Sequence, residues 1–213
     1  MQTVTELAIE RAGRGGVFTR EQAAVWAGNR GARLDALLKR AVGRHEIRRI
    51  HRGLYGLADR YTHARVNPLD LAQRIHGPSY VSLESALSHH GWIPEAVRAI
   101  TSVTLGRARS FDTPLGRFTY TRVPQRSFLS GVRRLSTEGG GAFFLATPLK
   151  AVADYVYAQR LDWRDAAPLR DSLRVEEDSL AELTAETFDE AMAAYGPGRV
   201  SRFLAGLRKD LKR

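Results

Sequence analysis

The stretch RHEIRRIHRGLYGLA, residues 44–58, decides the fold of the N-terminal part of the chain. Apolar residues stand on both sides of an Arg52-Gly53 step, and they are Ile47, Ile50, Leu54, Tyr55 and Leu57. Glycine reaches the positive φ that a tight turn requires at little steric cost. The stretch therefore predicts a short β-hairpin with Arg52 and Gly53 at its tip.

The predicted hairpin is cationic. It carries Arg48, Arg49, His51 and Arg52, and only Glu46 opposes them. A basic ribbon of this kind is suited to the phosphates that line a DNA groove. The alternative is a solvated edge strand, on which arginines discourage pairing with another sheet.

Two helices are expected upstream of the hairpin. The first runs from about Thr5 to Ala12 and stops at the glycines of residues 13–16. The second begins at a capping box formed by Thr19 and Gln22, with Phe18 placed for a hydrophobic staple, and it ends at Gly28.

A third helix, starting near Asn29, has two faces. Its buried face follows the helical period and contains Leu34, Leu37, Leu38, Ala41 and Val42. At about 100° per residue, a second stripe holds Arg33, Ala36, Arg40 and Arg44, whereas Lys39 lies on another side. A short residue among arginines suits insertion into a major groove, and the alternative is a solvated helix face.

Helix, helix, basic helix and basic hairpin is the order of a winged helix-turn-helix domain. We therefore predict an α+β protein, with a winged helix-turn-helix domain at residues 1–60 and a mixed α+β domain with a helical C-terminal end at residues 61–213. The candidate DNA-binding residues are Arg30, Arg33, Ala36, Arg40, Arg44, Arg48, Arg49, His51 and Arg52.

The charge balance favours a polyanionic partner. The chain of 213 residues has a formal net charge of +10 and a pI of about 10.5. Residues 1–60 hold 12 Lys and Arg against 6 Asp and Glu, whereas residues 61–213 hold 21 against 17. The N-terminal part is thus the more basic per residue, as expected if double-stranded DNA binds there.

Several classes of protein are excluded by composition. The chain has no cysteine, so disulfides, thiolate catalysis and cysteine-based zinc sites are excluded. No apolar run is long enough for a membrane span, and Glu6 and Glu10 lie where a signal peptide would be apolar. We expect a cytoplasmic protein with no membrane partner.

Beyond a polar linker at residues 59–67, the pattern becomes mixed. Helices are expected after Asn67-Pro68 and after Ser82, and another after Thr147-Pro148 that carries Lys150 and Asp154 as a surface ion pair. Residues 99–105 and 117–123 predict a strand hairpin joined by a loop at 106–116, and residues 142–146 predict a third strand. Two or three helices are expected in the remainder.

Charge is unevenly distributed in this second part. Arginines gather around the predicted loop, and Arg107, Arg109, Arg117 and Arg122 are candidates for a second anion-binding surface that meets DNA, RNA or an acidic protein. Residues 162–190 hold ten acids and three arginines, which is typical of solvated helix faces.

No catalytic constellation is visible in the sequence. The chain has no P-loop lysine, no GxSxG motif and no HExxH motif. His89 and His90 are adjacent on an expected helix, so their side chains diverge by about 100° and are poorly placed to share one metal ion. A nuclease centre around Glu84 and Asp112 has no support from spacing. We expect no enzyme activity, no catalytic residue, no metal and no cofactor.

Three segments together resemble the AbiEi-type antitoxins, which are DNA-binding members of bacterial abortive-infection toxin-antitoxin pairs. The segments are YVSLESALSHHGWIPE (80–95), ITSVTLGRARSFDTPLGRFTYTRV (100–123) and FFLATPLKAVADYVY (143–157), and they follow an RGLYGL hairpin (52–57). Their order and spacing carry the resemblance, which spans most of the chain up to about Leu161.

The resemblance implies a repressor that binds inverted repeats in its own promoter and neutralises a nucleotidyltransferase-type toxin in phage defence. It assigns DNA binding to the N-terminal domain and antitoxicity to the C-terminal domain. By position, it places Arg33, Arg40, Arg48, Arg49 and Arg52 at the DNA. The alternative function is a winged-helix regulator whose second domain senses a ligand or another partner.

Overall fold

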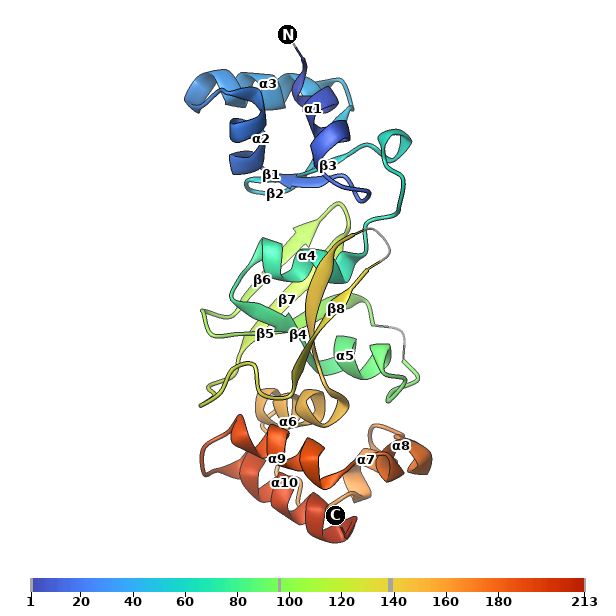
Figure 1. Cartoon of the computed structure of the whole chain (residues 1–213). Coiled ribbons are helices and arrows are strands. Elements are labelled where there is room, and N and C mark those ends of the chain that lie inside the picture. Colours follow the sequence, from blue (N-terminus) through green and yellow to red (C-terminus); the bar gives the residue numbers. More distant parts are fainter. Residues whose placement is uncertain (1, 96, 138–139, 213) are drawn as a thin grey trace.

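The structure is a computed structural model that describes residues 2–95, 97–137 and 140–212. It is a mixed α+β fold with two sheets, and ten α-helices are assigned in the described residues. The molecule is elongated, with an N-terminal unit, a central sheet and a C-terminal group of helices stacked in that order (Figure 1). None of the helices in the described ranges is both long and apolar enough to cross a membrane.

The N-terminal unit consists of three helices on one face of a small sheet (Figure 1). Its elements are α1 (Val4–Arg11), β1 (Val17–Thr19), α2 (Arg20–Ala27), α3 (Gly31–Gly43), β2 (Ile47–His51) and β3 (Leu54–Leu57), followed by the 3-10 helix η1 (Asp59–Tyr61). The strand order is β1-β3-β2, and both pairings are antiparallel. The helices and the hairpin expected from the sequence are confirmed, whereas β1 was not expected.

Local signals in the sequence explain where these elements begin and end. Thr19 accepts a hydrogen bond from the backbone N–H of Gln22, and the Gln22 side chain accepts one from the backbone of Thr19, which confirms the capping box. Gly28 ends α2 in the left-handed region with φ of 59°. Gly53 has φ of 75° at the hairpin tip, as a tight turn requires.

The small sheet is covered on both faces. Phe18, Ile47 and Leu57 belong to the core beneath the three helices. In contrast, Val17, Ile50 and Leu54 belong to the larger core that continues into the rest of the molecule. The hairpin therefore packs against the central part of the chain by its lower face.

This packing sets the behaviour of the isolated N-terminal unit. A fragment that ends at Tyr61 keeps its own core, so we expect native-like helical circular dichroism. It exposes Val17, Ile50 and Leu54, whose burial contributes roughly 1.5–3 kcal/mol each in the full chain, so it should be less stable and should self-associate. Sedimentation should show less association after Ile50→Thr and Leu54→Thr. An unfolded fragment would mean that residues 1–60 are not an independent domain.

The central part is built on a six-stranded sheet of order β6-β7-β5-β4-β9-β8. Its strands are β4 (Ser79–Val81), β5 (Ala99–Thr104), β6 (Arg109–Thr113), β7 (Gly116–Arg122), β8 (Val132–Ser136) and β9 (Ala142–Ala146). The helices α4 (Pro68–Ile75) and α5 (Leu83–His89) lie in this part of the chain (Figure 1).

Two expectations for this sheet are wrong. The segment 106–116 is not a loop between hairpin strands, because residues 109–113 form β6 and pair antiparallel with β7. The strands β5 and β7 do not form a hairpin either, since they run parallel with Ile100 opposite Phe118. The inserted β6 reverses the chain direction, and turn signals at Gly106 and Gly116 do not by themselves reveal a strand between them.

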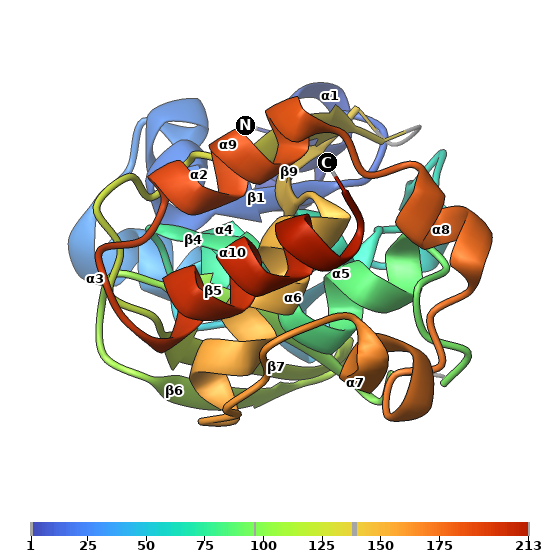
Figure 2. The same cartoon turned by 90° about the horizontal axis from the view of Figure 1, so that it is seen from below.

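The C-terminal group contains α6 (Pro148–Ala158), α7 (Ala167–Asp171), α8 (Glu177–Ala181), α9 (Ala185–Ala193) and α10 (Arg199–Asp210). Four helices follow α6 in the described residues, whereas two or three were expected. Seen from below, α9 and α10 lie side by side across α6 (Figure 2). The core is continuous from the central sheet into these helices.

Lys150 and Asp154 are not a surface pair, as the sequence pattern indicated, but are both fully buried. Lys150 Nζ lies 2.8 Å from Asp154 Oδ1 and contacts the hydroxyls of Tyr80 and Tyr195 at 2.5 and 3.0 Å. Ser82 is the N-cap residue of α5, but its hydroxyl makes no cap hydrogen bond and instead donates to Asp154 Oδ2 at 2.7 Å. The i, i+4 spacing identified the pair, but the helices that cover it come from distant sequence.

Candidate nucleic-acid interface

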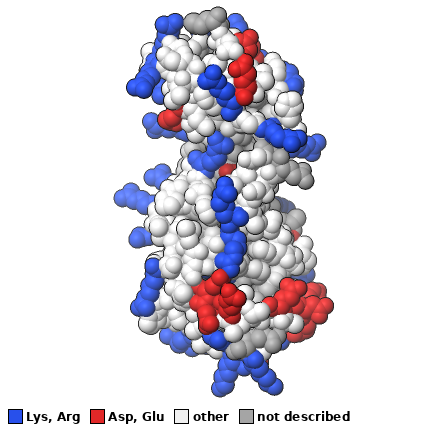
Figure 3. All heavy atoms as spheres, viewed as in Figure 1, with Lys and Arg blue, Asp and Glu red and all other residues white. Residues whose placement is uncertain are grey.

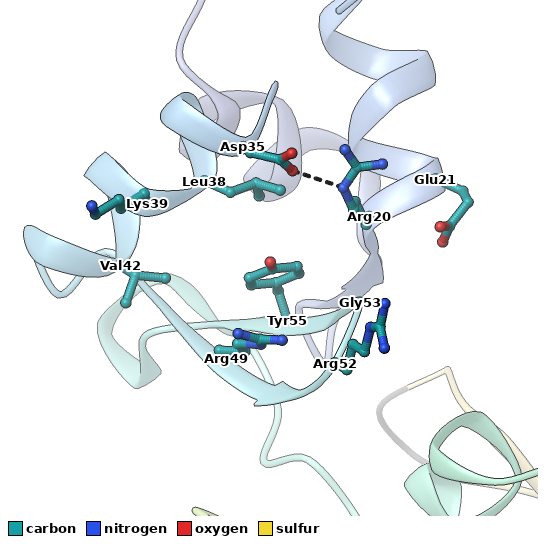
Figure 4. Close-up of a pocket in the computed structure, with 10 residues that line it drawn as sticks. All are labelled: Arg20, Glu21, Asp35, Leu38, Lys39, Val42, Arg49, Arg52, Gly53 and Tyr55. Carbon is teal, nitrogen blue, oxygen red and sulfur yellow. Dashed lines mark hydrogen bonds and ion pairs between the residues drawn. The ribbon is translucent and has the colours of Figure 1, made fainter. Parts of the chain in front are cut away.

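A cleft of about 770 Å³ lies between α3 and the β2–β3 hairpin. Figure 4 shows its lining, which comprises Arg20, Glu21, Asp35, Leu38, Lys39, Val42, Arg49, Arg52, Gly53 and Tyr55. Three cations, Lys39, Arg49 and Arg52, are exposed to solvent there. No ion pair within the described residues joins any of the three to a carboxylate. The cleft therefore offers positive charge to an anion from outside.

Two contacts fix the lining of the cleft, one at Tyr55 and one between Arg20 and Asp35. The Tyr55 ring stacks on the buried Phe18 ring with centroids 5.9 Å apart, which holds Tyr55 in place. Arg20 Nε donates to Asp35 Oδ1 at 2.8 Å, and this hydrogen bond lowers the pKa of Asp35 below its ordinary value. Because Asp35 already has this partner, its charge opposes a bound phosphate less.

The predicted arginine stripe on α3 is exposed as expected, but it lies on a different side of the helix from the cleft. Arg33, Ala36, Arg40 and Arg44 are all exposed. Lys39 and Arg40 point about 100° apart on a helix, so the cleft and the stripe flank the outward face of α3 on opposite sides. Arg30 is exposed at the N-cap of α3 and makes no side-chain cap. The arrangement presents cations on both flanks of one helix.

Lys39 was not among the candidates from the sequence. It falls outside the arginine stripe, and only the return of the hairpin toward α3 places it opposite Arg49 and Arg52 (Figure 4). Lys39 is spaced four residues from Asp35 and three from Val42, which puts these three cleft residues on one side of α3. This spacing could have identified Lys39 from the sequence.

Arg48 and His51 lie away from the cleft. The Arg48 guanidinium forms an ion pair with Asp59, at the start of the linker. The His51 ring packs edge-on against Phe111 of β6, with centroids 4.6 Å apart. Burial lowers the pKa of His51, and the nearby Arg49 adds to this effect. Both were candidate DNA-binding residues. Strand alternation places Arg48 on the face opposite to Arg49, and the register shift between Arg49 and His51 turns the His51 side chain toward the central part as well.

The four candidate arginines of the second part do not share one surface. Arg109 lies opposite Tyr120 in the β6–β7 register, so its side chain is on the same face as Tyr120 and Arg122. Arg117 lies on the other face, where its guanidinium is 3.8 Å from Asp112. Arg107 is exposed in the turn before β6. Arg109 and Arg122 therefore lie on one face of the sheet and Arg117 on the other.

The charged side chains are unevenly distributed over the surface (Figure 3). In that view, basic atoms mark the edges of the N-terminal unit and run over β8, and acidic atoms gather lower down near α8 and α9. Arg133 of β8 forms an ion pair with Glu190 of α9 at 2.6 Å, so part of the basic strip is compensated. The cleft cations are not compensated in this way.

His89 and His90 are placed differently from each other. His90 Nε2 lies 2.9 Å from the carbonyl oxygen of Ala146, whereas the His89 ring packs edge-on against Phe143. Within the described ranges, no group of three or more His, Cys, Asp or Glu side chains is arranged to hold a metal ion.

Comparison of the sequence with known proteins identifies no matching family model and no similar curated protein.

Proposed function

We propose that the chain is a DNA-binding repressor in which α1 to β3 form a winged helix-turn-helix domain. The order α1-β1-α2-α3-β2-β3, with an antiparallel sheet that ends in a hairpin, supports this assignment. The observation that carries the proposal is the cleft, which is lined by Lys39 of α3 on one side and by Arg49 and Arg52 of the hairpin on the other.

In this proposal, the outward face of α3 enters the major groove. Ala36 at its centre permits close approach, and Arg33 and Arg40 reach base edges or phosphates. The cleft cations meet the phosphates on the flank where the hairpin lies, and they set the register of the protein on the duplex. Affinity then comes mainly from neutralised phosphates, and sequence preference comes from α3.

The test is a binding titration of the full chain on the DNA upstream of its own gene. We expect tighter binding to this DNA than to a random duplex of equal length, and a logarithm of affinity that falls linearly with the logarithm of salt concentration. Equal affinity for both duplexes at every salt concentration would contradict a sequence-specific repressor.

We further propose that the chain acts as the antitoxin of a nucleotidyltransferase-type toxin, in phage defence, through residues 61–213. The support is the resemblance to AbiEi-type antitoxins in segments 80–95, 100–123 and 143–157. The edge strand β6 and its neighbour β7 expose arginines that can meet acidic groups of a partner protein.

The two faces of the β6–β7 pair allow a matched test of this surface. We expect Arg109→Glu with Arg122→Glu, both on one face, to abolish neutralisation, because charge reversal replaces attraction by repulsion. Arg117→Glu, on the other face, should neutralise normally. The assay co-expresses the toxin encoded next to the gene and scores growth beside a promoter reporter. Normal growth with the double variant would remove this face from the toxin contact.

A further inference from the structure

A second cleft, of about 1030 Å³, lies where the linker meets the central sheet. It is lined by Arg14, His63, Ala64, Arg65, Asn67, His89, Leu135, Ser136, Thr137 and Phe143. These residues come from the turn after α1, from the linker, from the end of α5 and from the β8–β9 pair. In Figure 1, α3 lies across the top of the molecule, whereas the linker and α5 lie below it on the right. DNA held on α3 would therefore leave this cleft open.

The polar side chains of this second cleft are mainly hydrogen-bond donors. Two arginines and two histidines line it, and none of its described lining residues is Asp or Glu. Neither Arg14 nor Arg65 forms an ion pair with a carboxylate in the described part of the chain. Asn67 uses its side-chain oxygen to accept from the backbone N–H of Leu69, which leaves its NH₂ group as a donor. Donors of this kind favour an anion.

Hydrogen bonds fix two segments that line the second cleft. The carbonyl oxygen of Arg14 accepts hydrogen bonds from the backbone N–H groups of His63 and Ala64, both at 3.2 Å, which ties the turn to the linker. Thr137 donates its hydroxyl to Asp70 Oδ2 at 2.7 Å. Asp70 is a nearby carboxylate, and this bond occupies its Oδ2, whereas its Oδ1 is buried and has no hydrogen-bond partner among the described residues.

An aromatic and apolar side completes the lining. Phe143 is 4% exposed, and its ring centroid lies 6.0 Å from that of His89. Leu135, opposite Phe143 in the β8–β9 register, is half-buried. Pockets for small molecules have volumes of about 300–1,000 Å³, and this cleft lies at the upper limit of that range, so it is far larger than a lone phosphate requires and has room for a ring and several phosphates.

We propose that this second cleft binds a phosphorylated small molecule of nucleotide size. Arg14 and Arg65 hold its phosphates, with His63 and His89 as further donors, and the Phe143 side accommodates its ring. The site is separate from the proposed DNA interface, and it spans the junction between the N-terminal unit and the central sheet.

The test is isothermal titration calorimetry of the full chain with metal-free ATP, inorganic pyrophosphate, adenosine and sulfate at matched ionic strength. We expect one ATP to bind per chain, more tightly than pyrophosphate, with no binding of adenosine or sulfate. Arg14→Ala and Arg65→Ala should each weaken ATP binding roughly ten- to hundred-fold, because each removes charge-assisted hydrogen bonds. Lys209→Ala, an exposed cation of α10, is the matched control and should bind as the unmodified chain does.

A second variant guards against a misleading result from misfolding. Ser136→Asp adds a negative charge at an exposed position of β8 and should abolish ATP binding while the thermal unfolding curve without ligand stays unchanged. Equal affinity for pyrophosphate and ATP would overturn the nucleotide assignment. Absence of heat with both phosphate probes would overturn the site itself. The site would also be overturned if Arg65→Ala and Arg49→Ala, which lies in the DNA cleft, weakened ATP binding equally. That result would indicate general attraction to polyanions.

Discussion

Replacing Lys150 with methionine is expected to destabilise the protein by about 3–5 kcal/mol, because it leaves the buried Asp154 carboxylate without its cation. Methionine keeps most of the length of the side chain, so a cavity contributes little to the loss. Asp154 retains neutral donors from Tyr80, Ser82 and Tyr195, at 2.8, 2.7 and 2.5 Å. These hydroxyls do not supply the missing charge.

The effect should extend to the packing of the C-terminal helices. Tyr195, between α9 and α10, is buried, and its hydroxyl contacts both members of the ion pair. Burial raises the pKa of Tyr195, so its hydroxyl stays protonated and remains a donor. The buried cluster of Lys150, Asp154, Tyr80 and Tyr195 thus links the segment between α9 and α10 to helix α6 and to strand β4, which contains Tyr80.

Urea unfolding followed by circular dichroism measures this loss as a lower midpoint. The matched control is Lys150→Met with Asp154→Leu, which removes both charges and should be more stable than Lys150→Met alone. Lys209→Met, at an exposed position, should change the midpoint little. A double variant as unstable as the single one would show that lost packing, rather than an unpaired charge, sets the cost.

The second large effect distinguishes the two cationic flanks of α3. Substituting Lys39, Arg49 and Arg52 together by alanine should weaken binding to promoter DNA and to random DNA alike. It should also flatten the salt dependence by about 0.9 units of slope for each phosphate that is no longer neutralised. The physical reason is that phosphates are the same at every sequence, so binding to them gives affinity without preference.

Substituting Arg33, Arg40 and Arg44 by alanine should give the opposite signature. If these side chains reach base edges, the preference for promoter over random DNA should fall by about 1–3 kcal/mol for each base edge that is no longer bound. The slope against salt should change less than in the cleft variant.

Fluorescence anisotropy at several salt concentrations, on both duplexes, separates the two signatures. A charge-matched control, in which Arg98, Arg202 and Lys209 are all replaced by alanine, should bind nearly as the unmodified chain does. If the control loses as much affinity as the cleft variant, net charge rather than the geometry of the cleft determines DNA binding.

The three helices and the hairpin of the N-terminal unit could be predicted from the sequence because their signals are local. A capping box at Thr19, a glycine at position 28 and a turn at Gly53 act within a few residues of chain. The burial of Leu34, Leu38 and Ala41 on α3 follows from helical spacing alone. The mixed α+β class and the exposed arginines on α3 were predicted on the same basis.

Other features depend on contacts between segments that are distant in sequence. The parallel pairing of β5 with β7 requires β6 to reverse the chain between them, and the short strands β1 and β8 are defined by their partners. The sequence spacing of Lys150 and Asp154 predicts a surface pair, but in the folded chain Tyr80 and Tyr195 cover both side chains.

The sequence by itself determined the periodicity of the helices, their caps, the hairpin turn and the excess of positive charge, because each follows from local sequence or from composition. The tertiary structure alone decided which cations share a surface. It brought Lys39 to Arg49 and Arg52, and it turned Arg48 and His51 toward other parts of the chain. It also placed Arg109 and Arg117 on opposite faces of one sheet. The physical reason is that strand register and packing set where a side chain points, and both depend on partners far away in the chain.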